Sequence, residues 1–393
     1  KRGDIVTRIG IDLGQFIADP YTSGIQRVLQ YLAREWPSEE VVADFVIPFA
    51  DGYLIASPRQ TAELLNEAFT AASPTELREM VAARVQQLSD ECLHVGLGTL
   101  VSIYSRWILP EVSYLPSVLE RLRIFEQSMP VIMIGYDTLP MTDPGNYRFV
   151  PGANAQVSEY FRLLTQADSI VCISEYARDS ILRRLRRDPT LPITVAHPGG
   201  DHVMDTEVAR DGAESAGGTG LTFLRVGTME ARKMPREILE AFLSARERNP
   251  NISLTFVGNP SASDTAINEA IREAVAADLG VSWIEGASDG DVWRHMQAAD
   301  AFLSLGIEGY GIPVLEAAML GTPTLYGGIQ PAAEIMEGRG ARCLGELDTV
   351  EIAESLLSWA EPGRIRDLSS EIDRQAVPRW RDFVHHVAER CVG

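Results

Sequence analysis

Two glutamates, Glu308 and Glu316, lie eight residues apart in a stretch that also contains glycines and a proline. The apolar run before them is typical of a buried strand, and Pro313 followed by helix formers predicts the start of a helix. Gly309 and Gly311 open the connecting loop, so the first N–H groups of the helix can face an anion such as a diphosphate. The carboxylates would repel that anion and accept hydrogen bonds from hydroxyl groups on either side of it. This pattern predicts a nucleotide-sugar site; the alternative is an ordinary strand-to-helix junction with solvated glutamates.

Two adjacent cations, Arg232 and Lys233, follow another strand-like run and the turn that contains Gly227 and Thr228. A planar guanidinium and a compact ammonium can together grip both phosphates of a diphosphate and offset its charge when it departs. The alternative is an exposed pair that caps a turn. The two motifs occur in the order that a single nucleotide-sugar site requires.

Apolar, strand-like runs alternate with helical segments along the chain. The runs lie at 5–13, 130–134, 167–173, 193–195, 221–226, 252–257, 281–284 and 299–305. This alternation predicts an α/β protein with two doubly wound parallel sheets, which bind ligands at the carboxyl ends of their strands. Between the two halves, segment 197–220 is rich in glycine and acid and poor in apolar residues, which is typical of a linker.

Composition restricts the class of protein. The chain has 393 residues, enough for two domains, and its formal net charge of −20 argues against a nucleic-acid partner. Four scattered cysteines, no apolar run of ~20 residues and no signal-peptide pattern favour the cytoplasm. One helical segment carries Arg183, Arg184, Arg186 and Arg187, which form either a solvated face or a contact with anionic lipid at the inner face of a membrane.

The two motifs resemble one known family. The stretch EGYGIPVLEA, which begins at Glu308, resembles the Glu-x7-Glu signature of group-1 (family four) retaining glycosyltransferases with the GT-B fold. VGTMEARK, which ends at Lys233, resembles the phosphate site of the same family. The resemblance implies that Glu316 holds the nucleotide ribose, that Glu308 lies near the donor sugar, and that the amides between them hold phosphate and sugar oxygens.

The resemblance also assigns further residues. Those implied to bind the nucleotide-sugar are Gly24, Gly227, Thr228, Gly258, Gly309, Tyr310, Gly311, Ile312, Pro313 and Glu316. Those implied to take part in catalysis are Arg232, Lys233, Glu308 and, on the acceptor side, Asp137. Tyr136 stands where the family usually has a histidine, which is a departure from its pattern.

The domain organisation that follows is a GT-B arrangement of two Rossmann-like domains facing a central cleft. Its parts are an N-terminal acceptor-binding domain at 1–196, the linker at 197–220, a C-terminal nucleotide-sugar domain at 221–375, and a terminal segment at 376–393. The helix of the terminal segment is expected to cross back and pack on the N-terminal domain.

The function implied is that of a retaining, metal-independent hexosyltransferase without a cofactor. It would move a mannosyl, rhamnosyl or glucosyl group from a GDP-, UDP- or dTDP-hexose to a saccharide or lipid-linked acceptor in bacterial surface glycan synthesis. Metal independence is expected because Arg232 and Lys233 can replace a cation and no Asp-x-Asp motif flanked by a strand argues for a metal. The alternatives are a nucleotide-sugar epimerase, a phosphorylase, or a nucleotide-sugar-binding subunit with little turnover. The oligomeric state is left open.

Overall fold

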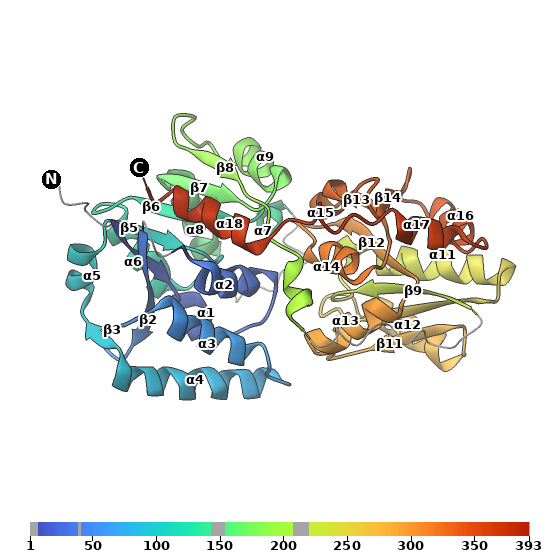
Figure 1. Cartoon of the computed structure of the whole chain (residues 1–393), viewed down its shortest axis with the longest axis horizontal. Coiled ribbons are helices and arrows are strands. Elements are labelled where there is room, and N and C mark those ends of the chain that lie inside the picture. The colour runs from blue at the N-terminus through green and yellow to red at the C-terminus, as the bar shows by residue number, and fades with distance from the viewer. Residues whose placement is uncertain (1–6, 38–40, 143–153, 207–219, 393) are drawn as a thin grey trace. The chain divides into compact units, whose positions relative to one another are not determined.

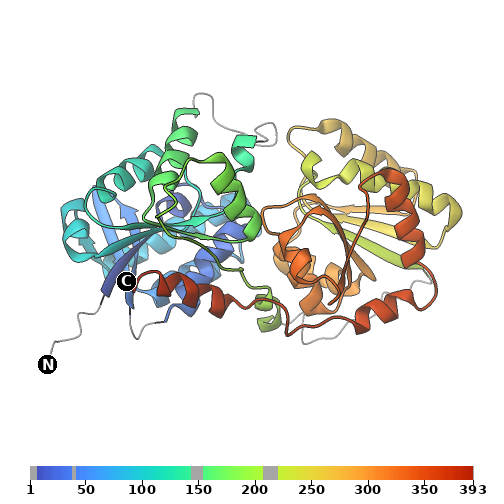
Figure 2. The same cartoon turned by 90° about the horizontal axis from the view of Figure 1, so that it is seen from above.

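The computed structural model describes residues 7–37, 41–142, 154–206 and 220–392. The chain divides into two compact units. Unit 1 comprises Lys1–Thr138, Arg148–Pro198 and Trp380–Gly393, and unit 2 comprises Leu139–Tyr147 and Gly199–Arg379. In each unit, helices cover both faces of a sheet (Figures 1 and 2), so both units have the α/β, doubly wound form that the alternation of elements predicts.

Unit 1 is built on an eight-stranded sheet in the order β4-β3-β2-β1-β5-β6-β7-β8. The strands are β1 (Thr7–Asp12), β2 (Val41–Phe49), β3 (Gly52–Ala56), β4 (Leu93–Val95), β5 (Arg106–Leu109), β6 (Val131–Gly135), β7 (Ser169–Cys172) and β8 (Ile193–Val195). The β2–β3 and β3–β4 pairs are antiparallel, and the other neighbours are parallel. The central strands are therefore parallel and end at one edge of the sheet.

The helices of unit 1 are α1 (Gly14–Ala18), α2 (Gly24–Glu35), α3 (Pro58–Ala68), α4 (Pro74–Glu91), α5 (Leu97–Ile103), α6 (Pro116–Phe125), α8 (Asn154–Gln166), α9 (Glu175–Arg184) and α18 (Trp380–Glu389). Side-chain caps set where several of them begin. Ser174 accepts a hydrogen bond from the Ala177 N–H at 3.0 Å, and Ser23 accepts one from the Ile25 N–H at 3.2 Å.

The C-terminal helix α18 lies in unit 1 against α2 (Figure 1), as the GT-B resemblance implies. The Trp380 ring stacks on the Tyr31 ring of α2 with centroids 4.6 Å apart, and His386 Nε2 lies 3.1 Å from Thr194 Oγ1. Buried aromatic stacking of this kind adds to the free energy gained from apolar burial. Helix α18 is thus fixed to the unit that contains β1 and α2.

Unit 2 is built on a six-stranded, all-parallel sheet in the order β11-β10-β9-β12-β13-β14. The strands are β9 (Leu221–Val226), β10 (Ile252–Val257), β11 (Val281–Ile284), β12 (Ala301–Ile307), β13 (Thr324–Ile329) and β14 (Ala341–Cys343). The helices are α7 (Leu139–Thr142), η2 (Asp201–Asp205), η3 (Ala231–Lys233), α11 (Pro235–Arg248), α12 (Thr265–Ala276), α13 (Asp289–Ala298), α14 (Ile312–Leu320), α15 (Pro331–Ile335), α16 (Thr349–Trp359) and α17 (Arg364–Ser370).

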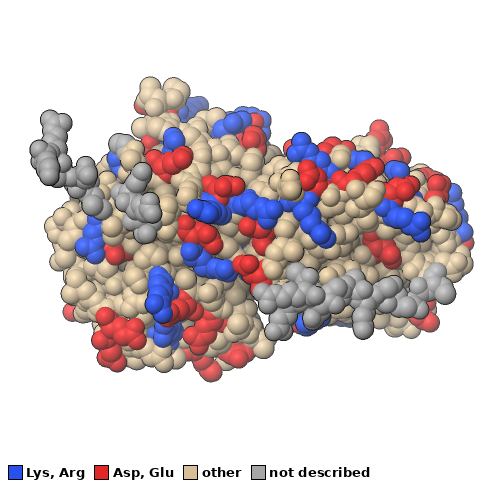
Figure 3. Space-filling view, viewed as in Figure 1, with Lys and Arg blue, Asp and Glu red and all other residues tan. Residues whose placement is uncertain are grey.

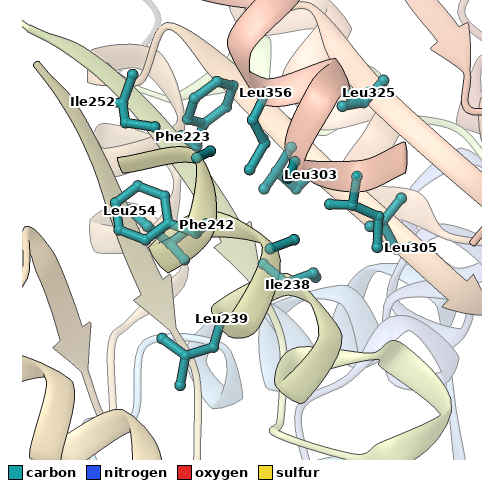
Figure 4. Close-up of a cluster of buried hydrophobic side chains, with 14 of the residues drawn as sticks. Phe223, Ile238, Leu239, Phe242, Ile252, Leu254, Leu303, Leu305, Leu325 and Leu356 are labelled. Carbon is teal, nitrogen blue, oxygen red and sulfur yellow. The ribbon is translucent and has the colours of Figure 1, made fainter. Parts of the chain in front are cut away.

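One apolar cluster holds the sheet of unit 2 to the helices on one of its faces (Figure 4). Phe223 and Leu303 from neighbouring strands meet Ile238 and Phe242 of α11 and Leu356 of α16, and all five are at most 1% exposed. Burial of such side chains is the main favourable contribution to folding. The cluster fixes β9 and β12, whose carboxyl ends carry the loops considered next.

Two predicted segments show structure that their composition does not indicate. In the predicted linker 197–220, η2 packs into unit 2 with Val203 fully buried; residues 207–219 lie outside the described ranges. In the cluster of four arginines, Arg187 is buried and donates to the carbonyls of Leu164, Thr165 and Pro192. Only the other three arginines are exposed.

Candidate donor-diphosphate site

Two loops of unit 2 meet at the carboxyl ends of β9 and β12. The strands are neighbours in the parallel sheet, with Leu224 opposite Phe302. Since neighbouring parallel strands end at one edge of a sheet, the loops that follow them lie together. The loop after β9 carries Arg232 and Lys233 in η3, and the loop after β12 carries Glu308 and leads into α14. The convergence predicted from the two motifs is therefore present.

Two glycines let these loops approach one another. Gly306, at the end of β12, has φ +95°, and a Cβ there would overlap the carbonyl oxygen of Arg232. Gly258, after β10, has φ +147°, and a Cβ there would overlap the carbonyl oxygen of Gly227. Any other residue at either position would move one loop away from the next and strain the backbone. Gly258, predicted to bind the ligand, thus supports the turn at Gly227.

Both predicted cations pair with Glu308. Lys233 Nζ lies 2.6 Å from Glu308 Oε1, and Arg232 Nη1 lies 2.9 Å from Glu308 Oε2. Arg232 also donates to the Ile307 carbonyl at 2.7 Å and lies 2.7 Å from Glu230 Oε2. The side chains of Arg232, Lys233 and Glu308 are 14%, 18% and 21% exposed, so they are sheltered from water yet within reach of a ligand. Ion pairs in such partly dry surroundings interact more strongly than pairs at an open surface.

The two cations control the charge of Glu308. Burial by itself would raise the pKa of this carboxyl, but attraction by Lys233 and Arg232 and the hydrogen bonds from both outweigh burial. The net effect lowers the pKa of Glu308 to about 2. Glu308 is therefore an anion at neutral pH and holds the two cations in place.

Arg225 is a residue of this site that the sequence reasoning missed. It lies within β9 with 2% of its surface exposed, and it donates to the carbonyls of Gly227 and Thr228, the latter at 3.0 Å. Burial lowers the pKa of Arg225 to about 10, against the attraction of Glu308 and Glu230. The guanidinium stays protonated at neutral pH and ties the turn to the sheet. A charged residue inside a mostly apolar strand was the signal available in the sequence.

The local charge is positive although the chain is acidic. Three cations (Arg225, Arg232 and Lys233) face two carboxylates (Glu230 and Glu308), whereas the formal net charge of the chain is −20. Lysine is also rare: the chain has only two, Lys1 and Lys233, among 35 lysines and arginines. A compact ammonium is thus placed at this loop in a chain that otherwise uses guanidinium groups, which differ in geometry and hydration.

The loop from β12 into α14 places the remaining predicted backbone ligands. Gly309 and Tyr310 are buried, whereas Gly311, Ile312 and Pro313 are half-buried. Gly311 is the N-cap residue of α14 and lacks a side-chain cap, and Pro313 lies in the first turn. The Tyr310 ring is 4% exposed, so it supports the loop, and a ligand here would meet the backbone and not the ring.

Glu316 lies one turn into α14 and is 7% exposed. Its Oε1 is 2.7 Å from Nε2 of His202, a residue of η2 that the sequence reasoning also missed. The edge of the Trp293 ring packs near His202, with ring centroids 5.6 Å apart. Glu316, which is predicted to bind the nucleotide ribose, therefore has a defined hydrogen-bond partner, His202, inside unit 2.

The two predicted residues in unit 1 follow different strands. Gly24 is exposed and opens α2, whereas Asp137 is half-buried and lies just after β6. Tyr136, where the family usually has a histidine, is buried and donates from its hydroxyl to the Pro110 carbonyl at 2.6 Å. Burial raises the pKa of Tyr136 well above its ordinary value. The Tyr136 hydroxyl is therefore engaged in a buried hydrogen bond within unit 1.

A buried carboxyl follows β5 in unit 1. Glu111 is 1% exposed and accepts hydrogen bonds from Gln26 Nε2 at 2.8 Å and from the Phe16 N–H at 3.1 Å. Burial raises the pKa of Glu111 to about 8; the hydrogen bonds from Gln26 and Phe16 lower this pKa, and the nearby Asp12 raises it. Asp12 is itself paired with Arg121 at 2.7 Å. Glu111 is thus a buried titratable group held by neutral donors.

The described part of the chain contains neither a cluster of metal ligands nor a helix that could span a membrane. Within 7–37, 41–142, 154–206 and 220–392, no group of three or more His, Cys, Asp or Glu could hold a metal ion. No helix in the same ranges is both long and apolar enough to pass through a bilayer. On the face drawn in Figure 3, acidic and basic side chains are interspersed.

One family model matches part of the chain. Residues 212–361 match the family model described as "Glycosyl transferases group 1". This segment contains the Arg232–Lys233 loop and the Glu308–Glu316 stretch. The match, together with the fold, confirms the resemblance to group-1 glycosyltransferases with the GT-B fold.

Particular relatives are more distant. Half of the chain, over 214 residues, is 25% identical to the serotype-specific mannosyltransferase WbdA of Escherichia coli, and a second WbdA sequence from that species is 24% identical. The aligned region covers only 26% of either mannosyltransferase.

Solved structures share the fold over nearly the whole chain. Anabaena Alr3699/HepE in complex with UDP and glucose aligns with a TM-score of 0.63 and 13% identity over 98% of this chain and 99% of its own. WaaG, a glycosyltransferase involved in lipopolysaccharide biosynthesis, aligns with a TM-score of 0.59 and 15% identity over 98% and 100%. At this identity the likeness establishes the fold, namely two Rossmann-like domains of the GT-B type.

Proposed function

We propose that this chain is a glycosyltransferase that takes a hexosyl group from a nucleotide-sugar and transfers it to a saccharide or lipid-linked acceptor with retention of configuration. The observation that carries the proposal is the pairing of Arg232 and Lys233 with Glu308 where β9 and β12 end. The family match over residues 212–361 and the description of the distant relatives as mannosyltransferases support it.

The chemistry requires stabilisation of a departing diphosphate. When the bond from the anomeric carbon to the diphosphate breaks, the electron pair leaves with the phosphate oxygen and negative charge grows there. Arg232 and Lys233 stabilise this charge in a partly dry site, and Arg225 adds a fixed positive charge behind the Gly227 turn. We propose that these cations replace a metal ion in this role.

Glu308 has two tasks in this scheme. In the free protein it neutralises the two cations and keeps them ordered. With donor bound, the diphosphate shares those cations, and the Glu308 carboxylate can accept a hydrogen bond from a hydroxyl of the donor sugar. In this proposal Glu316 accepts hydrogen bonds from the ribose, and the resemblance to the family assigns Asp137 to the acceptor side and Gly24 to nucleotide-sugar binding.

The donor that we propose is a GDP-, UDP- or dTDP-linked mannose, rhamnose or glucose, and the product is a bacterial surface glycan. The WbdA relatives favour mannose, and the structures of HepE with UDP and glucose favour a uridine nucleotide. The protein would act in the cytoplasm, with the exposed Arg183 and Arg184 in the last turn of α9 and Arg186 just after it available to meet anionic lipid at the inner face of the membrane.

The test is to incubate the protein with labelled GDP-, UDP- and dTDP-hexoses, with and without saccharide acceptors, and to measure release of nucleoside diphosphate. Acceptor-dependent release with an α-linked donor giving an α-linked product would support the proposal. Conversion of the donor without acceptor would point to an epimerase, and phosphate-dependent cleavage of a glycan would point to a phosphorylase.

A second candidate is a nucleotide-sugar-binding subunit with little turnover. It is favoured by Tyr136, whose hydroxyl is bound to the Pro110 carbonyl and so cannot serve as the family's histidine does. Tight binding of a nucleotide-sugar in calorimetry, without release of diphosphate for any acceptor, would favour this candidate.

A further inference from the structure

The segment before β9 is attached to the helix that carries Glu316. Gly200 packs so closely on α14 that a Cβ would overlap the Leu315 side chain, and its N–H donates to the Pro378 carbonyl at 3.1 Å. The next residues form η2, in which Val203 is fully buried. This close packing brings His202 beside Glu316.

Glu316 is the one polar residue of helix α14. The other eight residues of α14 (Ile312–Leu320) are all apolar, and the helix is buried from Val314 onwards. An ionised carboxylate in such surroundings loses its hydration, and its rotamer and charge are maintained only by a specific partner. A carboxylate that binds a ribose needs a fixed rotamer as well as its charge. A polar group displaced by even 1 Å loses most of its hydrogen-bond energy.

His202 supplies such a partner. Its Nε2 lies 2.7 Å from Glu316 Oε1, and the two side chains are 2% and 10% exposed. The Trp293 ring meets the imidazole ring at an angle of 63°, which restricts its rotation. The imidazole is therefore held in orientation by packing, and it holds one carboxylate oxygen in turn.

We propose that His202 is a positioning residue for nucleotide binding: it orients the Glu316 carboxylate toward the ribose hydroxyls. The inference rests on the proposed function, since it needs a nucleotide ribose at Glu316. It assigns a binding role to a segment that sequence patterns had marked only as a linker. His202 itself does not touch the ligand in this scheme.

The test compares three substitutions of His202 in the full chain. His202→Gln keeps an N–H donor at a similar distance from the backbone. His202→Leu removes the N–H donor altogether, and His202→Asn has an amide that is too short to reach the Nε2 position. Calorimetry measures the affinity of each for UDP and GDP and for their 2′-deoxy and 3′-deoxy forms. Glu316→Ala and the His202→Leu/Glu316→Ala double variant complete the cycle, and thermal unfolding identifies any variant that does not fold.

We expect His202→Leu and His202→Asn to weaken binding of the preferred ribonucleotide on the order of tenfold, as for loss of one partner of a buried hydrogen bond. His202→Gln should stay within about threefold of the wild type. The loss should disappear for the deoxy form that lacks the hydroxyl held by Glu316, and the double variant should bind like Glu316→Ala alone. A structural role without positioning would weaken the ribo and deoxy forms equally.

The inference is overturned if folded His202→Leu or His202→Asn binds the ribonucleotide as tightly as the wild type, or if the ribo and deoxy forms lose the same affinity. In either case Glu316→Ala still tests the ribose site, so the proposed function can survive. If the wild type binds neither diphosphate, the proposed function fails and this inference fails with it, which is a separate and recognisable result.

Discussion

Two glutamates that follow parallel strands, one in each unit, have opposite environments. Glu308 comes directly after β12 in unit 2 and meets two cations, which lower its pKa to about 2 against the effect of burial. Glu111 comes after β5 in unit 1 and accepts hydrogen bonds from a side-chain amide and a backbone N–H, which are neutral donors, so burial prevails and raises its pKa to about 8. Both glutamates follow the carboxyl end of a parallel strand, but the groups that each carboxylate contacts determine whether it is ionised at neutral pH.

The difference separates a site built for an anion from a structural polar cluster. At Glu308 the cations are partly exposed and can exchange the carboxylate for a phosphate. At Glu111 the donors are fully used inside the protein, and Gln26, which connects Glu111 to the Ser23 hydroxyl, is itself buried. We infer that Glu111 orders the start of α2, including the loop with Gly24.

The largest expected effect is on turnover and comes from removing Lys233, a cation that pairs with Glu308 and has no counterpart at Glu111. Lys233→Ala should lower kcat about 10²- to 10³-fold, the loss typical of removing one group that stabilises developing charge. Lys233→Arg should recover only part of the lost kcat, because a planar guanidinium group does not replace a compact ammonium group. The assay is release of diphosphate at saturating donor.

The matched control is Arg248→Ala, at the other end of α11, where the arginine is exposed and pairs with Glu354. It should leave turnover unchanged. Near-wild-type turnover in Lys233→Ala would remove the proposed role in leaving-group stabilisation.

The second effect concerns the charge behind the site. Arg225→Met keeps the volume but leaves the carbonyls of Gly227 and Thr228 without their donor, which should lower the free energy of unfolding by about 1–3 kcal/mol. Diphosphate affinity should fall as well, because the turn loosens and one positive charge is lost. Thermal unfolding and calorimetry measure the two effects, and a stable variant with wild-type affinity would show that Arg225 is dispensable.

The third effect uses pH to compare the two glutamates. Between about pH 4.5 and 8 a folded chain with Glu111 binds more protons than the unfolded chain, so stability contributed by this group falls as pH rises, by at most about 1.4 kcal/mol per pH unit. Glu111→Gln should remove that slope. The contribution of Glu308 is present above about pH 4.5 and is lost only as pH falls toward 2, so Glu308→Gln should shift stability by a constant amount from pH 5 to 8.

Urea unfolding of the wild type and both variants at several pH values gives the comparison. Parallel curves for wild type and Glu111→Gln would mean that Glu111 is ionised throughout this range. A slope difference for Glu308→Gln in the same range would mean that its cations do not hold it ionised.

The smallest effect is expected for Asp137 in unit 1. Asp137→Asn should raise KM for the acceptor and leave affinity for UDP or GDP within about twofold, since the diphosphate groups are assigned to unit 2. Calorimetry and acceptor titrations separate the two readouts. A large loss of nucleotide affinity would contradict the assignment of Asp137 to the acceptor side.

The sequence allowed the strand-loop-helix pattern and the meeting of two distant loops to be predicted, because both are set by local apolar runs and by the geometry of parallel sheets. Glu308, Arg232 and Lys233 lie together as expected. His202 was missed because η2 spans only five residues, too few for a periodic signal, inside a segment with a linker's composition. Arg225 carried a signal that was overlooked, a charge within an apolar strand, whereas the partners of Glu111 are 85 and 95 residues away and no local pattern joins them.

The central claim, that Lys233 meets the diphosphate of the donor, can be tested through the scarcity of lysine. Lys1 and Lys233 are the only lysines in the chain, so an amine-acylating reagent followed by peptide mass spectrometry reports on Lys233 with Lys1 as an internal control. Saturating UDP or GDP should slow acylation of Lys233 about tenfold or more, because only the small unliganded fraction reacts, while uridine or guanosine at equal concentration should not. Acylation of Lys233 at an unchanged rate with every nucleoside diphosphate would contradict the account.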